Sequence, residues 1–157
     1  MGIKILHGSC LDRLKGLEDQ SINTCITSPP YWGLRNYQEE EQLGLEETPE
    51  EFVENLVNVF REVKRVLRDD GTVWLNLGDS YSSGGRTTTT NQTLRGDKDY
   101  GVTRPKPSEG IKPKDLVGIP WRVAFALQAD GWYLRQDIIW HKPNPMPESV
   151  TDRCTKA

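Results

Sequence analysis

Segments rich in β-prone residues alternate along this chain with segments of helical periodicity, and that alternation limits the folds available to it. The β-prone segments cover residues 3–6, 21–27, 72–77 and 133–140. The helical segments cover residues 11–17, 49–68 and 120–129. Such alternation predicts parallel strands joined by right-handed crossovers. The fold class expected from the sequence is therefore α/β, with Trp74 and Trp140 of the predicted strands in its core.

The segment over residues 49–68 is the clearest helix in the sequence. Thr48 is a favourable N-cap residue, Pro49 suits the first helical position, and Glu51 completes a capping box. Gly71 is expected to stop this helix. Apolar residues at helical spacing give the helix one stripe for the core: Val53, Leu56, Val57, Phe60, Val63 and Leu67.

One segment, residues 80–118, interrupts the alternation with 39 residues that show no convincing periodicity. A compact domain rarely carries so long a loop unless the loop binds something or is disordered. The segment has seven basic and four acidic residues, so its net charge is +3, although the whole chain carries −3. Two interpretations stay open: a solvated flexible insert, or a segment that becomes ordered on nucleic acid.

The composition excludes several classes of protein and site. No apolar run of about 18 residues is present, so a membrane span is not expected. Residues 1–10 lack the apolar core and cleavage site of a signal peptide. The three cysteines are far apart without a CxxC pair, and the two histidines have no acidic cluster nearby, so neither a disulfide framework nor a metal site is expected. The expected location is the cytoplasm.

Residues 27–32 read Thr-Ser-Pro-Pro-Tyr-Trp and directly follow a predicted strand, at the sheet edge where open α/β folds bind ligands. Pro29 and Pro30 donate no backbone N–H and hold the chain extended, so carbonyls stay free to accept hydrogen bonds. The Ser28 hydroxyl adds an acceptor, and the Tyr31 ring offers a flat stacking surface. These groups suit a rigid pocket for an amino group on a planar ring. The alternative is an ordinary tight turn with Tyr31 packed on the core.

Ser28-Pro29-Pro30-Tyr31 resembles the catalytic motif of the amino-group DNA methyltransferases, the family that methylates cytosine N4 or adenine N6. Three further segments resemble elements of that family in the same order: residues 71–79, 119–132 and 137–145. The resemblance implies a Rossmann-like methyltransferase sheet that is mostly parallel. It also implies one partial catalytic domain over residues 1–157, with a flexible basic insert at about 80–118.

The mechanism that the resemblance implies is direct methyl transfer from S-adenosylmethionine to the exocyclic amine of a base flipped out of double-stranded DNA. Ser28 and the Pro29 carbonyl would accept the two N–H bonds of the amine, Pro30 would stiffen the loop, and Tyr31 would stack on the base. No metal or covalent intermediate is implied. Ser28 in the first motif position favours cytosine N4, because adenine-N6 members usually carry Asp or Asn there; adenine N6 is the alternative.

For the cofactor, the resemblance implies contacts from Ser9, Cys10, Leu11, Thr27 and Ser28. The family's glycine-rich cofactor loop, typically Phe-x-Gly-x-Gly, is missing from this sequence. We therefore expect the C-terminal cofactor-binding part of the fold to be absent. A complementary C-terminal half or a homodimer is the expected protein partner. The alternative function is an inactive remnant, or half of a split enzyme, that only binds DNA.

DNA contacts are predicted for aromatic and basic residues that follow the motif, lie in the basic insert or follow the last predicted strand: Trp32, Arg35, Arg86, Arg95 and Lys142. Cationic side chains position a protein on the phosphate backbone without reading its sequence. The alternatives are packing of the loop that contains Trp32 and Arg35 against the next helix, and simple solvent exposure of Lys142.

Overall fold

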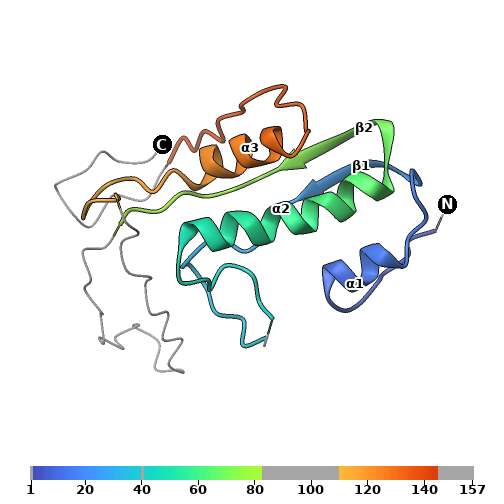
Figure 1. The fold of residues 1–157 in the computed structure, drawn as a ribbon, viewed down its shortest axis with the longest axis horizontal. Coiled ribbons are helices and arrows are strands. Elements are labelled where there is room, and N and C mark those ends of the chain that lie inside the picture. Colours follow the sequence, from blue (N-terminus) through green and yellow to red (C-terminus); the bar gives the residue numbers. More distant parts are fainter. Residues whose placement is uncertain (1, 40, 83–109, 145–157) are drawn as a thin grey trace.

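The computed structural model describes residues 2–39, 41–82 and 110–144. Its elements, in chain order, are α1 (Cys10–Lys15), β1 (Ile22–Thr27), α2 (Pro49–Val66), β2 (Leu67–Leu75) and α3 (Ile119–Ala129) (Figure 1). β1 and β2 form a parallel pair, and α2 is the crossover between them. The α/β class with a parallel sheet is therefore confirmed for the described part of the chain. No helix in these ranges combines the length and apolar character that crossing a membrane requires.

α2 has the N-terminus that the sequence predicts. Thr48 Oγ1 accepts a hydrogen bond from Glu51 N, and Glu51 Oε2 accepts one from Thr48 N, both at 3.2 Å, so the capping box is complete. The buried side of the helix comprises Phe52, Leu56, Val57, Val59, Phe60, Val63 and Val66. Full burial of one such side chain contributes about 1.5–3 kcal/mol, so this face is what holds α2 on the sheet.

The end of α2 differs from the prediction that Gly71 stops the helix, which is wrong. The helix ends at Val66, and Leu67 already has extended dihedrals (φ −78°, ψ 138°), so β2 begins without a loop. Gly71 lies inside β2 near an irregularity in the pairing with β1. A Cβ at Gly71 would lie 2.6 Å from Leu67 Cγ and 3.0 Å from Asn23 O. The glycine therefore permits a close backbone approach within the sheet.

Two predicted strands, over residues 3–6 and 133–140, are wrong for the described structure. Both segments are irregular, and their apolar side chains are largely exposed, Trp140 among them. A strand needs a neighbouring backbone to supply its hydrogen bonds. Among the described residues, regular pairing is confined to β1 with β2. A β-prone sequence without a neighbouring strand therefore stays irregular, and Trp140 lies outside the core.

The two faces of the sheet differ in their cover. α2 and α3 lie on one face, and the core cluster there includes Phe52, Leu56, Phe60, Val63, Ile119 and Val123. Cys25 and its cross-strand neighbour Val73 pack against this cluster. Alternate residues point to the opposite face, where the register pair Ile26 and Trp74 is 78% and 53% exposed. The expectation of a buried Trp74 is therefore wrong, because no helix in the described ranges covers that face.

The predicted insert over residues 80–118 is anchored at both ends. Ser82 N donates to Asp115 O at 2.8 Å, and an antiparallel bridge joins the same two stretches. The ends of the insert are therefore held side by side, next to the start of α3. The middle of the insert, residues 83–109, lies outside the described residues.

Candidate active site

The motif over residues 28–31 follows β1 directly, at the carboxyl edge of the parallel sheet. The pairing of the two strands continues one step past this point, because Asn76 N donates to Thr27 O at 2.9 Å. The residues that leave β2 therefore come alongside the residues that leave β1. The predicted place of the motif, at the end of a strand and on this edge, is confirmed.

Two of the predicted catalytic residues meet at this edge. Ser28 Oγ donates to Tyr31 Oη at 3.4 Å, and Tyr31 Oη donates to Asn76 Oδ1 at 3.3 Å. Ser28 is exposed and Tyr31 is only half-buried. Both separations are longer than the usual range of about 2.5–3.0 Å for O–H···O bonds. The hydroxyl groups are thus loosely aligned and accessible, which disfavours a Tyr31 sealed inside the core.

Glycines hold the motif loop from two sides. A Cβ at Gly78 would lie 2.6 Å from Cδ2 and Cε2 of Tyr31, so the ring lies directly on the backbone there. Gly44 has a φ of +94°, and a Cβ there would lie 3.0 Å from Tyr31 O and 3.2 Å from Pro30 Cβ. Gly33 N also donates to Gly44 O at 2.8 Å. A side chain at Gly78 or at Gly44 would displace the motif loop.

Sequence reasoning missed Asn76 and Gly44 as parts of this site. Asn76 lies just after β2, and the rule that parallel strands end at one edge is the signal that could have found it. Gly44 lies in an irregular stretch before α2 and carries no comparable signal.

The predicted DNA contacts have different surroundings. Trp32 is 7% exposed and belongs to the core cluster, and its Nε1 donates to Glu46 O at 3.0 Å. This burial favours the packing alternative for Trp32 over a contact with DNA. Arg35 and Lys142 are exposed. Two further predicted contacts lie outside the described residues: Arg86 and Arg95.

The residues predicted to contact the cofactor form two separate groups. Ser9 and Cys10 are exposed at the start of α1, with Leu11 half-buried. Arg65, in the last turn of α2, holds α1 near the amino end of β1. Its guanidinium donates to Leu14 O in α1 and to Leu17 O just after α1, and its own carbonyl accepts from Gln20 N, two residues before β1. Thr27 and Ser28 lie at the carboxyl end of β1. The structure therefore does not bring the five predicted cofactor residues together: they lie near opposite ends of β1.

Asp79, just after the second strand, connects the site to the helical layer. Its carboxylate accepts hydrogen bonds from Gly118 N at 3.0 Å, Ile119 N at 3.1 Å and Ser80 N at 2.8 Å. The Gly118 and Ile119 N–H groups lie at the start of α3, where Gly118 has a φ of +78° and provides no side-chain cap. Asp79 therefore caps α3 from a distant part of the chain.

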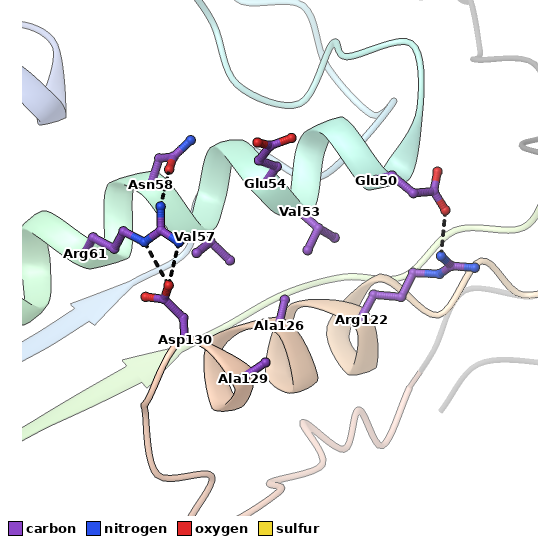
Figure 2. Close-up of a pocket in the computed structure, with 10 residues that line it drawn as sticks. All are labelled: Glu50, Val53, Glu54, Val57, Asn58, Arg61, Arg122, Ala126, Ala129 and Asp130. Carbon is purple, nitrogen blue, oxygen red and sulfur yellow. Dashed lines mark hydrogen bonds and ion pairs between the residues drawn. The ribbon is translucent and has the colours of Figure 1, made fainter.

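A groove of about 510 Å³ lies between α2 and α3, and no residue of the predicted site lines it. Figure 2 shows an ion pair at each end, Arg61 with Asp130 at 2.6 Å and Arg122 with Glu50 at 2.7 Å. The hydrogen bond from the Arg61 guanidinium lowers the pKa of the Asp130 carboxyl. The groove is therefore part of the interface between α2 and α3, with an ion pair at each end; it is called the α2–α3 seam below. Its apolar lining includes Val53, Val57 and Ala126.

Comparison with known proteins gives consistent matches along nearly the whole chain. The profile of the DNA methylase family (N6_N4_Mtase) matches residues 22–157. The Type II methyltransferase M.SmaI of Serratia marcescens is 52% identical over 157 residues, which cover 98% of this chain and 52% of that protein. M.Cfr9I of Citrobacter freundii is 53% identical over 156 residues, which cover 99% of this chain and 52% of that protein.

A third relative gives the same picture. The Type II methyltransferase M.XycI of Xanthomonas campestris pv. cyanopsidis is 55% identical over 152 residues, covering 97% of this chain and 50% of that protein. The chain thus spans about half the length of the curated relatives it matches. No solved structure shows a significant match. The profile match and these identities establish that the chain belongs to the DNA methylase family of amino-group DNA methyltransferases.

Proposed function

We propose that this chain forms the amine-binding part of a site-specific DNA methyltransferase that uses S-adenosylmethionine and modifies the exocyclic amine of a flipped base. The observation that carries the proposal is the Ser28–Tyr31 hydroxyl pair, 3.4 Å apart and accessible at the carboxyl edge of a parallel sheet. Membership in the DNA methylase family supports DNA as the substrate, and the Type II names of the relatives support site-specific modification.

The residues of the motif address the main chemical difficulty of the reaction. The exocyclic nitrogen is a poor nucleophile because its lone pair is delocalised into the ring. Ser28 Oγ and the Pro29 carbonyl accept its two N–H bonds, favour a more tetrahedral nitrogen and stabilise the positive charge that develops there. Pro30 stiffens the loop, and Tyr31 stacks on the base and keeps it aligned. An N–C bond forms as the methyl–sulfur bond breaks, and one amine proton passes to solvent.

The residues present fit S-adenosylmethionine in part. When bound, this group supplies an electrophilic methyl on a sulfonium. Thr27 and Ser28 would lie against the methyl-bearing end, because they continue into the motif loop. Ser9, Cys10 and Leu11 at the start of α1 would hold another portion. The remaining contacts would come from the polypeptide that completes the fold.

Cytosine N4 is the amine that the motif favours. The support for cytosine N4 is the residue at the first motif position: Ser28 presents a neutral hydroxyl there, whereas adenine-N6 members usually carry Asp or Asn. Cytosine N4 and adenine N6 have similar geometry, so adenine N6 is the second candidate. The exposed Arg35 and Lys142 are the described residues that would contact phosphates. A DNA substrate of this kind implies a location in the cytoplasm.

We propose further that the polypeptide that completes the fold covers the bare face of the sheet, defined by Ile26 and Trp74. All-parallel sheets in α/β proteins have cover on both faces. The relatives from Serratia and Citrobacter are about twice as long as this chain, so about half of each lies outside the match. That unmatched part, here called the second half, can supply this cover. A Rossmann-like sheet with helices on both faces would result.

Binding of the second half of the Serratia relative, followed by titration calorimetry, tests this placement. Trp74→Ser is expected to weaken binding at least about tenfold, because hot-spot aromatics dominate interfaces. Trp121→Ser is the matched control, since Trp121 lies on α3 and is 48% exposed against 53% for Trp74. Equal losses in the two variants would contradict the placement. Stable self-association through the Trp74 face would instead favour a homodimer.

Transfer of tritium from methyl-labelled S-adenosylmethionine to unmethylated bacterial genomic DNA tests the activity itself. The chain together with the second half of the Serratia relative is expected to label the DNA. Ser28→Ala is expected to lower the rate about 100-fold, the usual cost of one preorganised hydrogen-bonding partner. Ser21→Ala, an exposed serine that precedes β1 and donates to Glu18 O, is the matched control. Unlabelled DNA with the wild-type assembly would refute the proposed activity.

A further inference from the structure

Asn76 is the first residue after β2, and the neighbouring strand fixes its place. Asn76 N donates to Thr27 O at 2.9 Å, which holds it opposite the residue that precedes Ser28. Its side-chain Oδ1 accepts a hydrogen bond from Tyr31 Oη at 3.3 Å. The residue is exposed, so packing of the core does not require an amide at this position.

The three polar side chains form a chain of hydrogen bonds with one direction. Ser28 Oγ donates to Tyr31 Oη, and Tyr31 Oη donates to Asn76 Oδ1. A hydroxyl has one proton and two acceptor lone pairs. When the Ser28 proton points at Tyr31, the lone pairs of Ser28 remain available on its other sides. The direction therefore leaves Ser28 as an acceptor.

The last acceptor in this series of hydrogen bonds decides the direction of the series. A carboxamide oxygen can only accept, so Asn76 Oδ1 draws the Tyr31 proton away from Ser28. Without an acceptor at position 76, the Tyr31 proton can turn toward Ser28 and displace the Ser28 proton from that contact. The Ser28 proton would then point at the incoming amine, where a donor would face another donor.

We propose that Asn76 is a positioning residue that keeps the Ser28 hydroxyl in its accepting orientation, acting through Tyr31. The inference rests on the proposed function and adds to it the residue that follows β2. Gly78 supports the arrangement, because the Tyr31 ring lies directly on its backbone. The separations of 3.3 and 3.4 Å are expected to shorten once a base is bound, as hydrogen bonds in active sites without substrate often do.

Two substitutions at one position separate this role from a structural one. Asn76→Leu keeps a similar volume without an acceptor, whereas Asn76→Asp keeps an acceptor oxygen. In the tritium-transfer assay with the second half of the Serratia relative, Leu is expected to lower kcat about 30-fold with KM for DNA within about threefold. Asp is expected to retain kcat within about threefold. Asn23→Leu, exposed near the amino end of β1, is the control and is expected to match wild type.

A spectroscopic measurement on the chain alone gives a readout that does not depend on activity. With ¹³C-labelled tyrosine, the Cζ resonance that disappears in Tyr31→Phe reports the hydrogen bond of the Tyr31 hydroxyl. Asn76→Leu is expected to shift this resonance, and Asn76→Asp to shift it in the opposite sense, because a carboxylate is the stronger acceptor. Asn23→Leu is expected to leave the resonance in place.

Each outcome bears on the inference. Rescue of kcat by Asp but not by Leu, with the resonance moved by Leu, supports it. Equal losses with Asp and Leu, full activity with Leu, or an unmoved Tyr31 resonance in the Leu variant overturns it. If the wild-type assembly does not methylate DNA, the proposed function fails, and the resonance alone then decides whether Asn76 holds the Tyr31 proton.

Discussion

The helical layer formed by α2 and α3 is built differently from the carboxyl edge formed by residues 28–31 and 76–78. In the helical layer, fully buried apolar side chains such as Phe52 and Val123 make the contacts, and ion pairs lie at the rim. At the carboxyl edge, exposed or half-buried polar groups and glycines make them. Stability is therefore expected to reside in the first region and chemistry in the second.

Phe52→Ala is expected to have the largest effect on stability. Phe52 is fully buried and belongs to the core cluster, and removing such a ring typically costs about 3–5 kcal/mol of unfolding free energy. Urea denaturation followed by circular dichroism measures the loss. Phe125→Ala is the matched control, because Phe125 lies on α3 and is 57% exposed; its cost is expected to stay below about 1 kcal/mol. Similar costs for the two variants would contradict a helical layer held by its buried face.

Tyr31→Ala tests the other half of the comparison. It removes the stacking ring and the centre of the hydroxyl chain, so methyl transfer is expected to fall about 100-fold, equivalent to about 2.7 kcal/mol. The unfolding free energy is expected to change by less than about 1 kcal/mol, because Tyr31 lies outside the core cluster. A variant that unfolds readily while its folded fraction stays fully active would reverse the roles of the two regions.

Asp79→Ala tests how the two regions are connected, because Asp79 follows directly after the carboxyl-edge residues 76–78 and its side chain caps α3. Loss of a cap costs about 0.5–2 kcal/mol, so the unfolding free energy is expected to fall by that amount. Amide hydrogen exchange should show the loss of protection concentrated in the first turn of α3. Asp79→Asn keeps one acceptor oxygen and is expected to lose less. Unchanged protection of Gly118 and Ile119 in the Ala variant would contradict the capping role.

The smallest expected effect concerns the Arg61–Asp130 ion pair at the end of the α2–α3 seam. Arg61 lowers the pKa of Asp130, so the pair stabilises the folded state above the unfolded pKa of Asp, about 3.9, and the contribution is lost as pH falls through the lower folded value. Arg61→Met is therefore expected to lower Tm slightly at pH 7, with the difference from wild type shrinking below about pH 3.9. Arg68→Met, an exposed arginine outside the seam, is the control. A difference that grows on acidification would contradict the assignment.

The fold could be predicted from the sequence where its signals are local. The capping box of Thr48 with Glu51 lies within one segment and is confirmed. The apolar stripe of α2 is confirmed in part: the helix also buries Phe52, Val59 and Val66, and Leu67 belongs to β2. The role of Gly71 depends on the backbone of β1, which the sequence of β2 does not reveal. The segments over 3–6 and 133–140 have β-prone residues, but a strand also needs a partner that propensity cannot provide.

The candidate site shows the same division. Residues 28–31 could be placed at the sheet edge because they follow a predictable strand without a gap. Asn76 and Gly44 contact the motif only in the folded chain. The shared edge of parallel strands could have indicated Asn76, but no sequence rule predicts Gly44. For Trp32 the sequence allows either contact with DNA or packing in the core. Only the folded structure, in which Trp32 Nε1 donates to Glu46 O, shows that the side chain is buried.

The identity of the methylated nucleoside tests the central claim, an exocyclic amine held by Ser28 beside Tyr31, most directly. DNA incubated with the wild-type assembly and deuteromethyl-labelled S-adenosylmethionine is digested to nucleosides and analysed by mass spectrometry. The account predicts label on an exocyclic nitrogen, as N4-methylcytosine, and loss of that product with Ser28→Ala. Label on a ring carbon such as cytosine C5, or an undiminished yield from Ser28→Ala, would contradict it.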